Sequence, residues 1–198
     1  MIKRIALKIT NFIFHNTELD TELFEVYQYG VEITISTLLN IFWIIAASIV
    51  LTDVLSGVIF LAVFISLRSF VGGYHAKTYF MCNALFLLTY LLVYYISSVA
   101  AIFIDKETFS MLLTVTILLG IIPIIACSPV PHKNKPLSEK QSRICRIIGI
   151  VVFILISITA LALHFSDVKY GSFIIITLAS VSVLIIIEVS KSGRKKSD

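Results

Sequence analysis

The segment from Arg68 to Cys82 carries residue types that could act together in chemistry. His75 precedes the thiol of Cys82 by seven residues, and Gly72 and Gly73 lie just before that histidine. An imidazole close to a thiol can take its proton, and the resulting thiolate is a strong nucleophile. The segment, which lies in a polar gap between two long apolar runs, therefore predicts nucleophilic catalysis by a Cys–His pair.

The spacing of this pair requires a turn in the backbone. On one continuous helix, His75 and Cys82 would share a face but lie about 10 Å apart along the axis. Proton transfer needs the two side chains within about 3 Å of each other, or bridged by one water. We expect the chain to reverse at Gly72 and Gly73, whose backbone reaches conformations closed to other residues. Their N–H groups could also face a reacting carbonyl.

Taken singly, these residues also have ordinary explanations. A lone cysteine in a membrane protein is most often a small apolar packing residue, which fits Cys127 and Cys145. An arginine such as Arg68 can extend to the lipid headgroups. A zinc site would have suitable ligand types but no CxxC or HxxxH spacing, so we expect neither a metal nor a cofactor. Its four ligands would be His75, Cys82, Cys127 and His132.

The composition is that of a membrane protein. Of the 198 residues, 58% are hydrophobic and only 14% are charged, and the mean hydropathy is +0.99. The charges form short islands between apolar runs that approach the roughly 20 residues needed to cross a bilayer. We predict an all-α, polytopic integral membrane protein that forms a single membrane domain, residues 1–198. Six transmembrane helices are expected, at about residues 33–51, 54–67, 84–104, 109–127, 147–165 and 170–187.

Residues 1–14 have an amphipathic pattern. At about 100° per residue, the apolar side chains fall on one arc and the basic ones opposite. The apolar arc holds Ile2, Ile5, Ala6, Ile9, Phe12 and Ile13. This pattern favours a helix lying in the headgroup region, within an interfacial N-terminal segment 1–30. A short helix packed on the protein's own bundle is the alternative.

The second expected span is shorter than the others. Its 14 residues, 54–67, would make about 21 Å of helix against a hydrocarbon core of roughly 30 Å. The residues that follow remain largely apolar up to Met81. We therefore expect a partly re-entrant catalytic segment, 68–83, covered by the bundle because irregular backbone at membrane depth needs such cover.

Basic residues are divided unequally between the two sides of the predicted bundle. One side holds both termini and the long polar gaps 68–83 and 128–146, and the other side holds Lys106 and Lys169. Since the chain has 16 lysines and arginines, 14 lie on the first side. Cytoplasmic loops carry an excess of such residues, which predicts that both termini and the catalytic segment face the cytoplasm.

Two separate motifs resemble those of one family. The accessory gene regulator B (AgrB) family of membrane endopeptidases, from Gram-positive quorum sensing, has a signature similar to Arg68-x3-Gly72-Gly73-x-His75-Ala76-x5-Cys82. The stretch 129–138 resembles the family's cytoplasmic loop after the fourth span. Length, span count and orientation fit as well, so the resemblance covers essentially the whole chain.

The resemblance implies a cysteine endopeptidase that processes an AgrD-type precursor peptide. Cys82 would attack a carbonyl in the C-terminal part of the precursor, with His75 as general base, and keep the remaining peptide as a thioester. A thiol or hydroxyl of the peptide would then close a thiolactone or lactone ring, which gives the autoinducing peptide. Arg68 matches a family position needed for activity, and it could stabilise the thiolate or hold a precursor carboxylate. Asn83 and Glu139 are third members of the site only in principle, so we predict a dyad.

The loop 128–146 is the main basic surface of the chain. As a docking surface for the acidic tail of the precursor, its residues would be Lys133, Lys135, Lys140 and Arg143. The alternative is a determinant of topology that is attracted to anionic lipid. No stacking platform accompanies these charges, so nucleic-acid binding is not expected. The resemblance also implies a location in the bacterial cell membrane and a homodimer.

Two other classes of function stay open, a small membrane transporter or exporter of a peptide and a non-catalytic membrane scaffold. Transport usually needs ionisable or broken-helix sites near midspan. The spans here are nearly free of charge, with Arg68 and Glu188 at their ends. A scaffold predicts that Cys82→Ser is silent, whereas a peptidase predicts that it abolishes processing.

Overall fold

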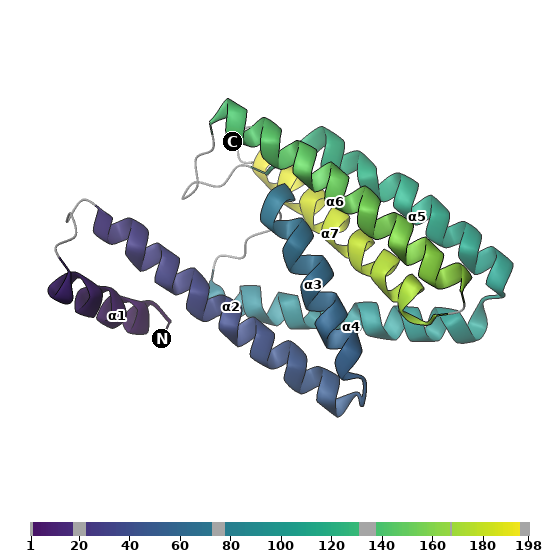
Figure 1. The fold of residues 1–198 in the computed structure, drawn as a ribbon, viewed down its shortest axis with the longest axis horizontal. Coiled ribbons are helices and arrows are strands. Elements are labelled where there is room, and N and C mark those ends of the chain that lie inside the picture. The colour runs from purple at the N-terminus through teal and green to yellow at the C-terminus, as the bar shows by residue number, and fades with distance from the viewer. Residues whose placement is uncertain (1, 18–22, 73–77, 131–137, 167, 195–198) are drawn as a thin grey trace.

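The protein is a helical bundle. The computed structural model describes residues 2–17, 23–72, 78–130, 138–166 and 168–194. Within these ranges the chain forms seven helices and no strand: α1 (Ile2–Asn16), α2 (Phe24–Val50), α3 (Val54–Val71), α4 (Tyr79–Phe103), α5 (Lys106–Cys127), α6 (Glu139–Phe165) and α7 (Tyr170–Arg194) (Figure 1). Helices α2 to α7 are each long and apolar enough to cross a membrane, which confirms the predicted all-α fold with six spans.

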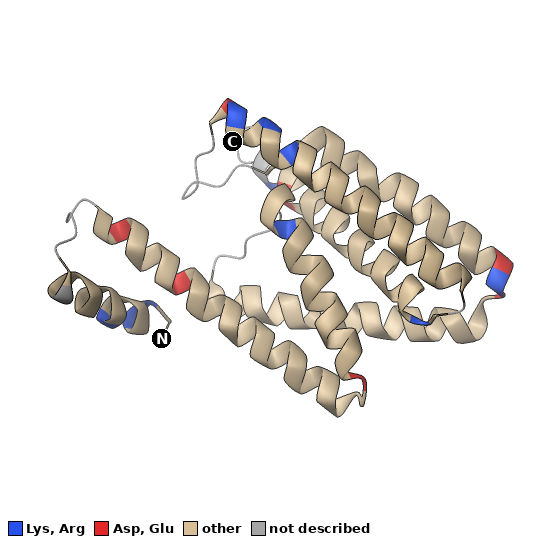
Figure 2. Cartoon of the chain, in the orientation of Figure 1, with Lys and Arg blue, Asp and Glu red and all other residues tan. Residues whose placement is uncertain are grey.

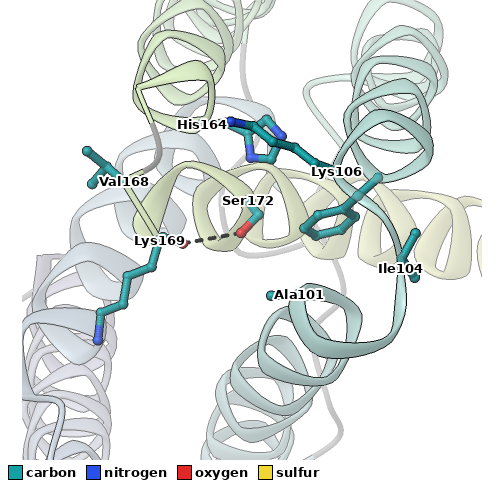
Figure 3. Close-up of a pocket in the computed structure, with 8 residues that line it drawn as sticks. Ala101, Ile104, Lys106, His164, Val168, Lys169 and Ser172 are labelled. Carbon is teal, nitrogen blue, oxygen red and sulfur yellow. Dashed lines mark hydrogen bonds between the residues drawn. The ribbon is translucent and has the colours of Figure 1, made fainter.

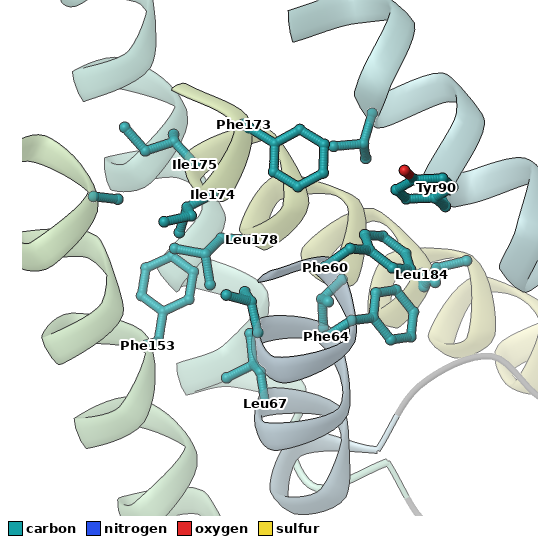
Figure 4. Packing of buried hydrophobic residues seen from close by; sticks show 14 of the residues in the cluster. Phe60, Phe64, Leu67, Tyr90, Phe153, Phe173, Ile174, Ile175, Leu178 and Leu184 are labelled. Atoms are coloured by element: carbon teal, nitrogen blue, oxygen red, sulfur yellow. The ribbon is translucent and has the colours of Figure 1, made fainter. Parts of the chain in front are cut away.

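Helix α7 lies at the centre of the bundle. It packs against α3, α4, α5 and α6, and it buries the largest share of its apolar length among the six spans. Its buried side chains are Phe173, Ile174, Ile175, Leu178, Val181, Leu184 and Ile185, several of which are drawn in Figure 4. The hydroxyl of Ser182 donates a hydrogen bond of 2.7 Å to the carbonyl of Gly120 on α5. Contacts of this kind matter in lipid, where apolar burial does not by itself favour helix association.

The outside of the bundle is apolar. Leu118 on α5 and Leu155 on α6 lie near the middle of their helices, and they are 63% and 60% exposed. A water-soluble bundle places polar residues at such positions, whereas a membrane bundle presents apolar side chains to the acyl chains. The exposed surface therefore fits a protein that spans the bilayer.

Helices α3 and α4 pack through a ladder of aromatic side chains. The ring of Phe64 lies 4.8 Å from that of Phe86, and the ring of Phe60 lies 5.3 Å from that of Tyr90, measured between centroids. The hydroxyl groups of Tyr90 and Ser56 are 2.8 Å apart. The rings of Phe60, Phe64 and Tyr90 lie together in Figure 4. Residues four apart lie on one face of a helix, so each step of the ladder is one turn. The numbers rise on α3 as they fall on α4, which shows that the two helices run in opposite directions.

Helix α1 packs against the first half of α2 (Figure 1). Ala6 and Thr10 are fully buried there, and Phe14 makes edge-on contacts with Phe24 and Tyr27 at 5.1 and 5.5 Å. The predicted apolar arc is thus divided between α2 and the outside, where Ile5, Ile9 and Phe12 are exposed. The packed alternative describes one part of α1, and the headgroup location of the exposed part stays a prediction. Helix α2 begins at Phe24, so residues 24–30 belong to it.

Several helices continue beyond the predicted spans. Helix α3 runs from Val54 to Val71, so its 18 residues span about 27 Å and include Arg68. The expectation of a span ending at residue 67 was therefore wrong, because a charged residue can continue a helix at the membrane surface. The middle of the expected re-entrant segment, residues 73–77, lies outside the described residues.

Asp53 connects α3 with the start of α7 at the end of the bundle that has the short connections. Its carboxylate accepts hydrogen bonds from the backbone N–H of Ser56 at 3.2 Å, from Lys169 at 3.0 Å and from Tyr170 at 2.9 Å. Burial by itself raises the pKa of the Asp53 carboxyl, but these hydrogen bonds outweigh burial and lower the pKa below its ordinary value of 3.8. Asp53 thus caps α3 and ties it to the start of α7.

The lowered pKa of Asp53 predicts a pH-dependent stability. A carboxyl with a lowered folded-state pKa stabilises the fold above its unfolded value, near 3.8, and loses this effect as the pH falls through the folded value. In Asp53→Asn the side chain still accepts the bond from Ser56 but has no charge for Lys169. We expect this variant to unfold in detergent at a lower apparent melting temperature at neutral pH, with the gap to wild type closing below pH 3.8. A gap that does not change with pH would contradict this account.

Candidate functional site

Residues of both sequence motifs lie at one end of the bundle. This end, here named the site end, consists of the starts of α2, α4 and α6 and the ends of α3, α5 and α7. Lys and Arg residues occur here on α3 and along the start of α6 (Figure 2). Among the predicted site residues, Arg68, Gly72, Cys82, Lys140 and Arg143 are described. The others, Gly73, His75, Lys133 and Lys135, lie outside the described residues.

The aromatic ladder continues to Arg68 and Cys82. Arg68 lies one turn beyond Phe64 on α3, and Cys82 lies one turn before Phe86 on α4. The guanidinium carbon of Arg68 is 5.5 Å from the centroid of the Phe64 ring, within the range of a cation–π contact. The same guanidinium is in hydrogen-bonding and electrostatic contact with the thiol of Cys82. A positive charge in contact with the thiol stabilises negative charge on the sulfur.

Cys82 lies in the first turn of α4. The hydroxyl of Thr78 caps this helix by accepting a hydrogen bond of 3.2 Å from the backbone N–H of Met81. The N–H of Cys82 donates to the carbonyl of Thr78 at 3.0 Å, which is the first regular bond of the helix. The positive end of the helix dipole is therefore close to the sulfur, and it also favours negative charge there. Two independent features thus suit Cys82 to act as a nucleophile.

Gly72 ends α3 where the sequence required a turn. Its φ of +75° and ψ of −150° lie in a region that only glycine readily adopts. The N–H of Val130 donates a hydrogen bond of 3.1 Å to the carbonyl of Val71, and a Cβ added to Gly72 would lie 3.2 Å from that nitrogen. Because Val130 belongs to the second motif, the two motifs are in direct contact. The N–H of Gly72 donates a hydrogen bond of 3.0 Å to the carbonyl of Arg68. A role of this N–H toward an oxyanion stays a prediction.

A polar seam joins α2 to the start of α4. The hydroxyl of Tyr79 donates to one carboxyl oxygen of Glu32 at 2.7 Å, and the amide of Gln28 donates to the other at 3.1 Å. One turn further, the hydroxyl of Ser36 donates to the side-chain oxygen of Asn83 at 2.8 Å. Only 6% of Glu32 is exposed. Sequence reasoning missed this seam, although polar residues four apart in an apolar helix were a signal for it.

Helix α7 adds the carboxyl group of Glu188 to the site. The carboxyl of Glu188 interacts electrostatically with Arg68, and its Oε2 atom is buried without a hydrogen-bond partner among the described residues. Sequence reasoning had placed Glu188 only at the end of a span. The site end therefore brings together Arg68, Cys82 and Glu188 from three different helices.

A sequence model described as accessory gene regulator B matches residues 6–189. The chain belongs to the accessory gene regulator B family. Two AgrB-like proteins of Clostridium perfringens, from strain 13 (type A) and strain SM101 (type A), are each 25% identical to it over 146 residues. These residues cover 72% of this chain and 67% of each relative. No solved structure matches it.

Family membership confirms the predicted resemblance and gives the site a context. This AgrB-family chain is a multi-pass membrane protein of agr-type quorum sensing, and the family implies an AgrD-type peptide as its substrate. The motif residues Arg68 and Gly72 lie at the end of α3, and Cys82 lies in the first turn of α4, so all three belong to the site end. A peptide bound at the membrane surface could reach a thiol in this position.

Lys140 and Arg143 are both exposed in the first turns of α6. A capping box starts this helix, in which the Ser138 hydroxyl accepts from the N–H of Gln141 and the Gln141 side chain accepts from the N–H of Ser138. Further along, Nε of Arg146 donates a bond of 2.6 Å to the carbonyl of Ser128. Their exposure suits either a docking surface or contact with anionic lipid.

A cavity of about 260 Å³ lies at the opposite end of the bundle (Figure 3). Lys106, His164, Lys169 and Ser172 contribute its polar groups, and the hydroxyl of Ser172 donates to the carbonyl of Lys169 at 3.2 Å. None of the three cysteines lines it. The cavity and the thiol of Cys82 are therefore separate features.

The backbone of Gly72 predicts a strong effect of Gly72→Ala. An alanine would be strained at this φ and would crowd the nitrogen of Val130, at a cost of about 1–3 kcal/mol. We expect a lower apparent melting temperature in detergent, together with a loss of peptide processing in membranes. Gly30→Ala is the matched control, because no atom lies within 4 Å of a Cβ added at this position in the second turn of α2. Equal behaviour of the two variants would show that the conformation of Gly72 has no importance.

Proposed function

We propose that this AgrB-family protein is a membrane cysteine endopeptidase that cleaves an AgrD-type precursor and promotes cyclisation of the retained peptide. The observation that carries the proposal is the contact between Arg68 and the thiol of Cys82 in the first turn of α4. In the proposal Cys82 is the nucleophile, His75 is the general base, and Arg68 stabilises the thiolate. The family match supports the substrate class.

The first half of the reaction would form an acyl-enzyme. His75 takes the thiol proton of Cys82, and the sulfur attacks a carbonyl carbon in the C-terminal part of the precursor. The tetrahedral intermediate then breaks its C–N bond, and the proton held by His75 passes to the leaving amine. The N–H of Gly73 is a proposed donor to the oxyanion. The N–H of Gly72 would act in the same way only by giving up its hydrogen bond of 3.0 Å to the carbonyl of Arg68. The tail leaves, and the N-terminal part of the precursor stays on Cys82 as a thioester.

The second half of the reaction would release a ring. A thiol or hydroxyl of the bound peptide attacks the thioester carbonyl, loses its proton to His75, and expels Cys82 as a thiolate. Arg68 stabilises that thiolate as it leaves. A thioester keeps enough reactivity for this transfer, and the partly buried position of Cys82 disfavours attack by water. Shelter at the site end would therefore favour cyclisation over hydrolysis.

We propose that the site end faces the cytoplasm of a bacterial cell. Of the 16 lysines and arginines, only Lys106 and Lys169 belong to the connections of the opposite end, whereas the other 14 lie in the two termini and in the long connections 68–83 and 128–146. This bias is the usual determinant of orientation. A precursor made in the cytoplasm would then reach Cys82 without crossing the membrane.

The identity of the nucleophile can be tested by co-expression with a tagged AgrD-type precursor. Cys82→Ala should reduce cleavage by at least about a thousandfold, because no acyl-enzyme can form. Cys127→Ala and Cys145→Ala are matched controls, since both thiols are partly buried and distant in sequence from the motif that holds Arg68 and Cys82. Mass spectrometry should find a wild-type product one water lighter than the linear fragment. Cleavage that persists in Cys82→Ala would favour an exporter or a scaffold instead.

The basic surface at the start of α6 can be tested with the acidic tail of the precursor. If Lys140 and Arg143 bind this tail, the double variant Lys140→Glu and Arg143→Glu should raise KM by about tenfold, with kcat almost unchanged. A precursor whose tail acids are replaced by amides should show no such difference. Lys106→Glu, at the opposite end, reverses one charge where the double variant reverses two, so it shows how much KM responds to net charge away from the basic surface. A KM for the acidic-tail precursor that is the same in wild type and in the double variant would leave these residues with lipid contact alone.

A further inference from the structure

Glu188 lies on the buried face of α7. Leu184 and Val181 precede it by four and seven residues, and both are buried in the core. Residues at this spacing share one face of a helix, so Glu188 extends the core-facing stripe by one turn. Helix α7 packs along α3, the helix that carries Arg68. A carboxyl group thus lies at a position where the spacing of the buried residues predicts an apolar side chain.

Glu188 is half-buried as a residue, but one oxygen of its carboxyl group is shielded from solvent. Its Oε2 atom has no hydrogen-bond partner among the described residues, and an uncompensated charge at such a position is costly. The interacting cation is Arg68, whose guanidinium also contacts Phe64 and the thiol of Cys82. Arg68 therefore lies between an acid on α7 and the sulfur on α4. The arginine side chain has several rotatable bonds, so its guanidinium keeps one orientation best when it has a partner on each side.

We propose that Glu188 is a positioning residue, which holds the guanidinium of Arg68 against the thiol of Cys82. The proposal rests on the proposed role of Cys82 as nucleophile, and it assigns to α7 a function beyond packing. Glu188 touches neither the substrate nor the reacting atoms in this assignment. It acts only through Arg68, by keeping that side chain in the one orientation that stabilises the thiolate.

This role predicts the direction in which the reactivity of the Cys82 thiol changes when Glu188 is removed. If Glu188 merely neutralised Arg68, its removal would strengthen the positive field at Cys82 and make the thiol more reactive. If Glu188 orients Arg68, its removal lets the guanidinium turn away, and the thiol becomes less reactive. The rate at which a small thiol reagent modifies Cys82 separates the two cases, and it needs no peptide substrate.

The test is a double-mutant cycle on the full-length protein in detergent. Iodoacetamide is the probe, and the background carries Cys127→Ser and Cys145→Ser so that only Cys82 reacts. Glu188→Gln and Arg68→Gln should each slow alkylation by about tenfold, and the double variant should be no slower than Arg68→Gln alone. Glu188→Asp, which keeps the charge, should recover part of the rate. Glu25→Gln removes an exposed acid at the start of α2 and should leave the rate unchanged.

Three outcomes would overturn the proposal. They are faster alkylation in Glu188→Gln, an unchanged rate, and losses in the two single variants that multiply in the double variant. An apparent melting temperature measured for each variant shows whether a loss of rate comes from unfolding. Should the wild-type protein cleave no precursor, the proposed function fails, yet the alkylation cycle still decides whether Glu188 orients Arg68.

Discussion

The stacking of α3 on α4 is the constraint on which the site depends. Lipid supplies no hydrophobic force between helices, so their relative position is set by how their side chains interlock. Phe60 and Phe64 interlock with Phe86 and Tyr90 at one-turn intervals, and one further turn brings Arg68 to Cys82. A slip of the ladder by a single turn would separate the charge from the sulfur. The chemistry at the membrane surface thus depends on aromatic packing inside the membrane.

The charges of Glu32 and Arg68 at the site end are compensated by contacts within the bundle. Glu32 is buried, and its two oxygens accept from Tyr79 and Gln28. Arg68 lies among an aromatic face, a thiol and an acid. In a medium of low polarity such contacts are needed to keep charges at this depth, and they also limit the motion of the groups involved. The same contacts that allow the charges to be buried therefore preorganise the site.

The contact between Gly72 and Val130 explains why two distant motifs occur in one chain. The first motif ends α3, and the second follows α5, about 60 residues later in the sequence. The hydrogen bond from Val130 to Val71 brings the second motif against the end of the first, and only a glycine leaves room for that approach. The second motif therefore shapes the site in addition to carrying positive charge.

The sequence by itself determined the all-α membrane fold, the six spans and the segment that holds Arg68 and Cys82. These features are local, because bilayer thickness fixes the length of an apolar run and a motif is read along the chain. The sequence placed the end of α3 too early, since hydropathy marks the hydrocarbon core and not the end of the helix. The tertiary structure decided that Glu32 and Glu188 lie at the site, that α1 packs on α2, and that Gly72 meets Val130. Such neighbours depend on how each helix is rotated and shifted against the next, and the apolar pattern of a membrane helix, which is nearly uniform around its circumference, does not specify this.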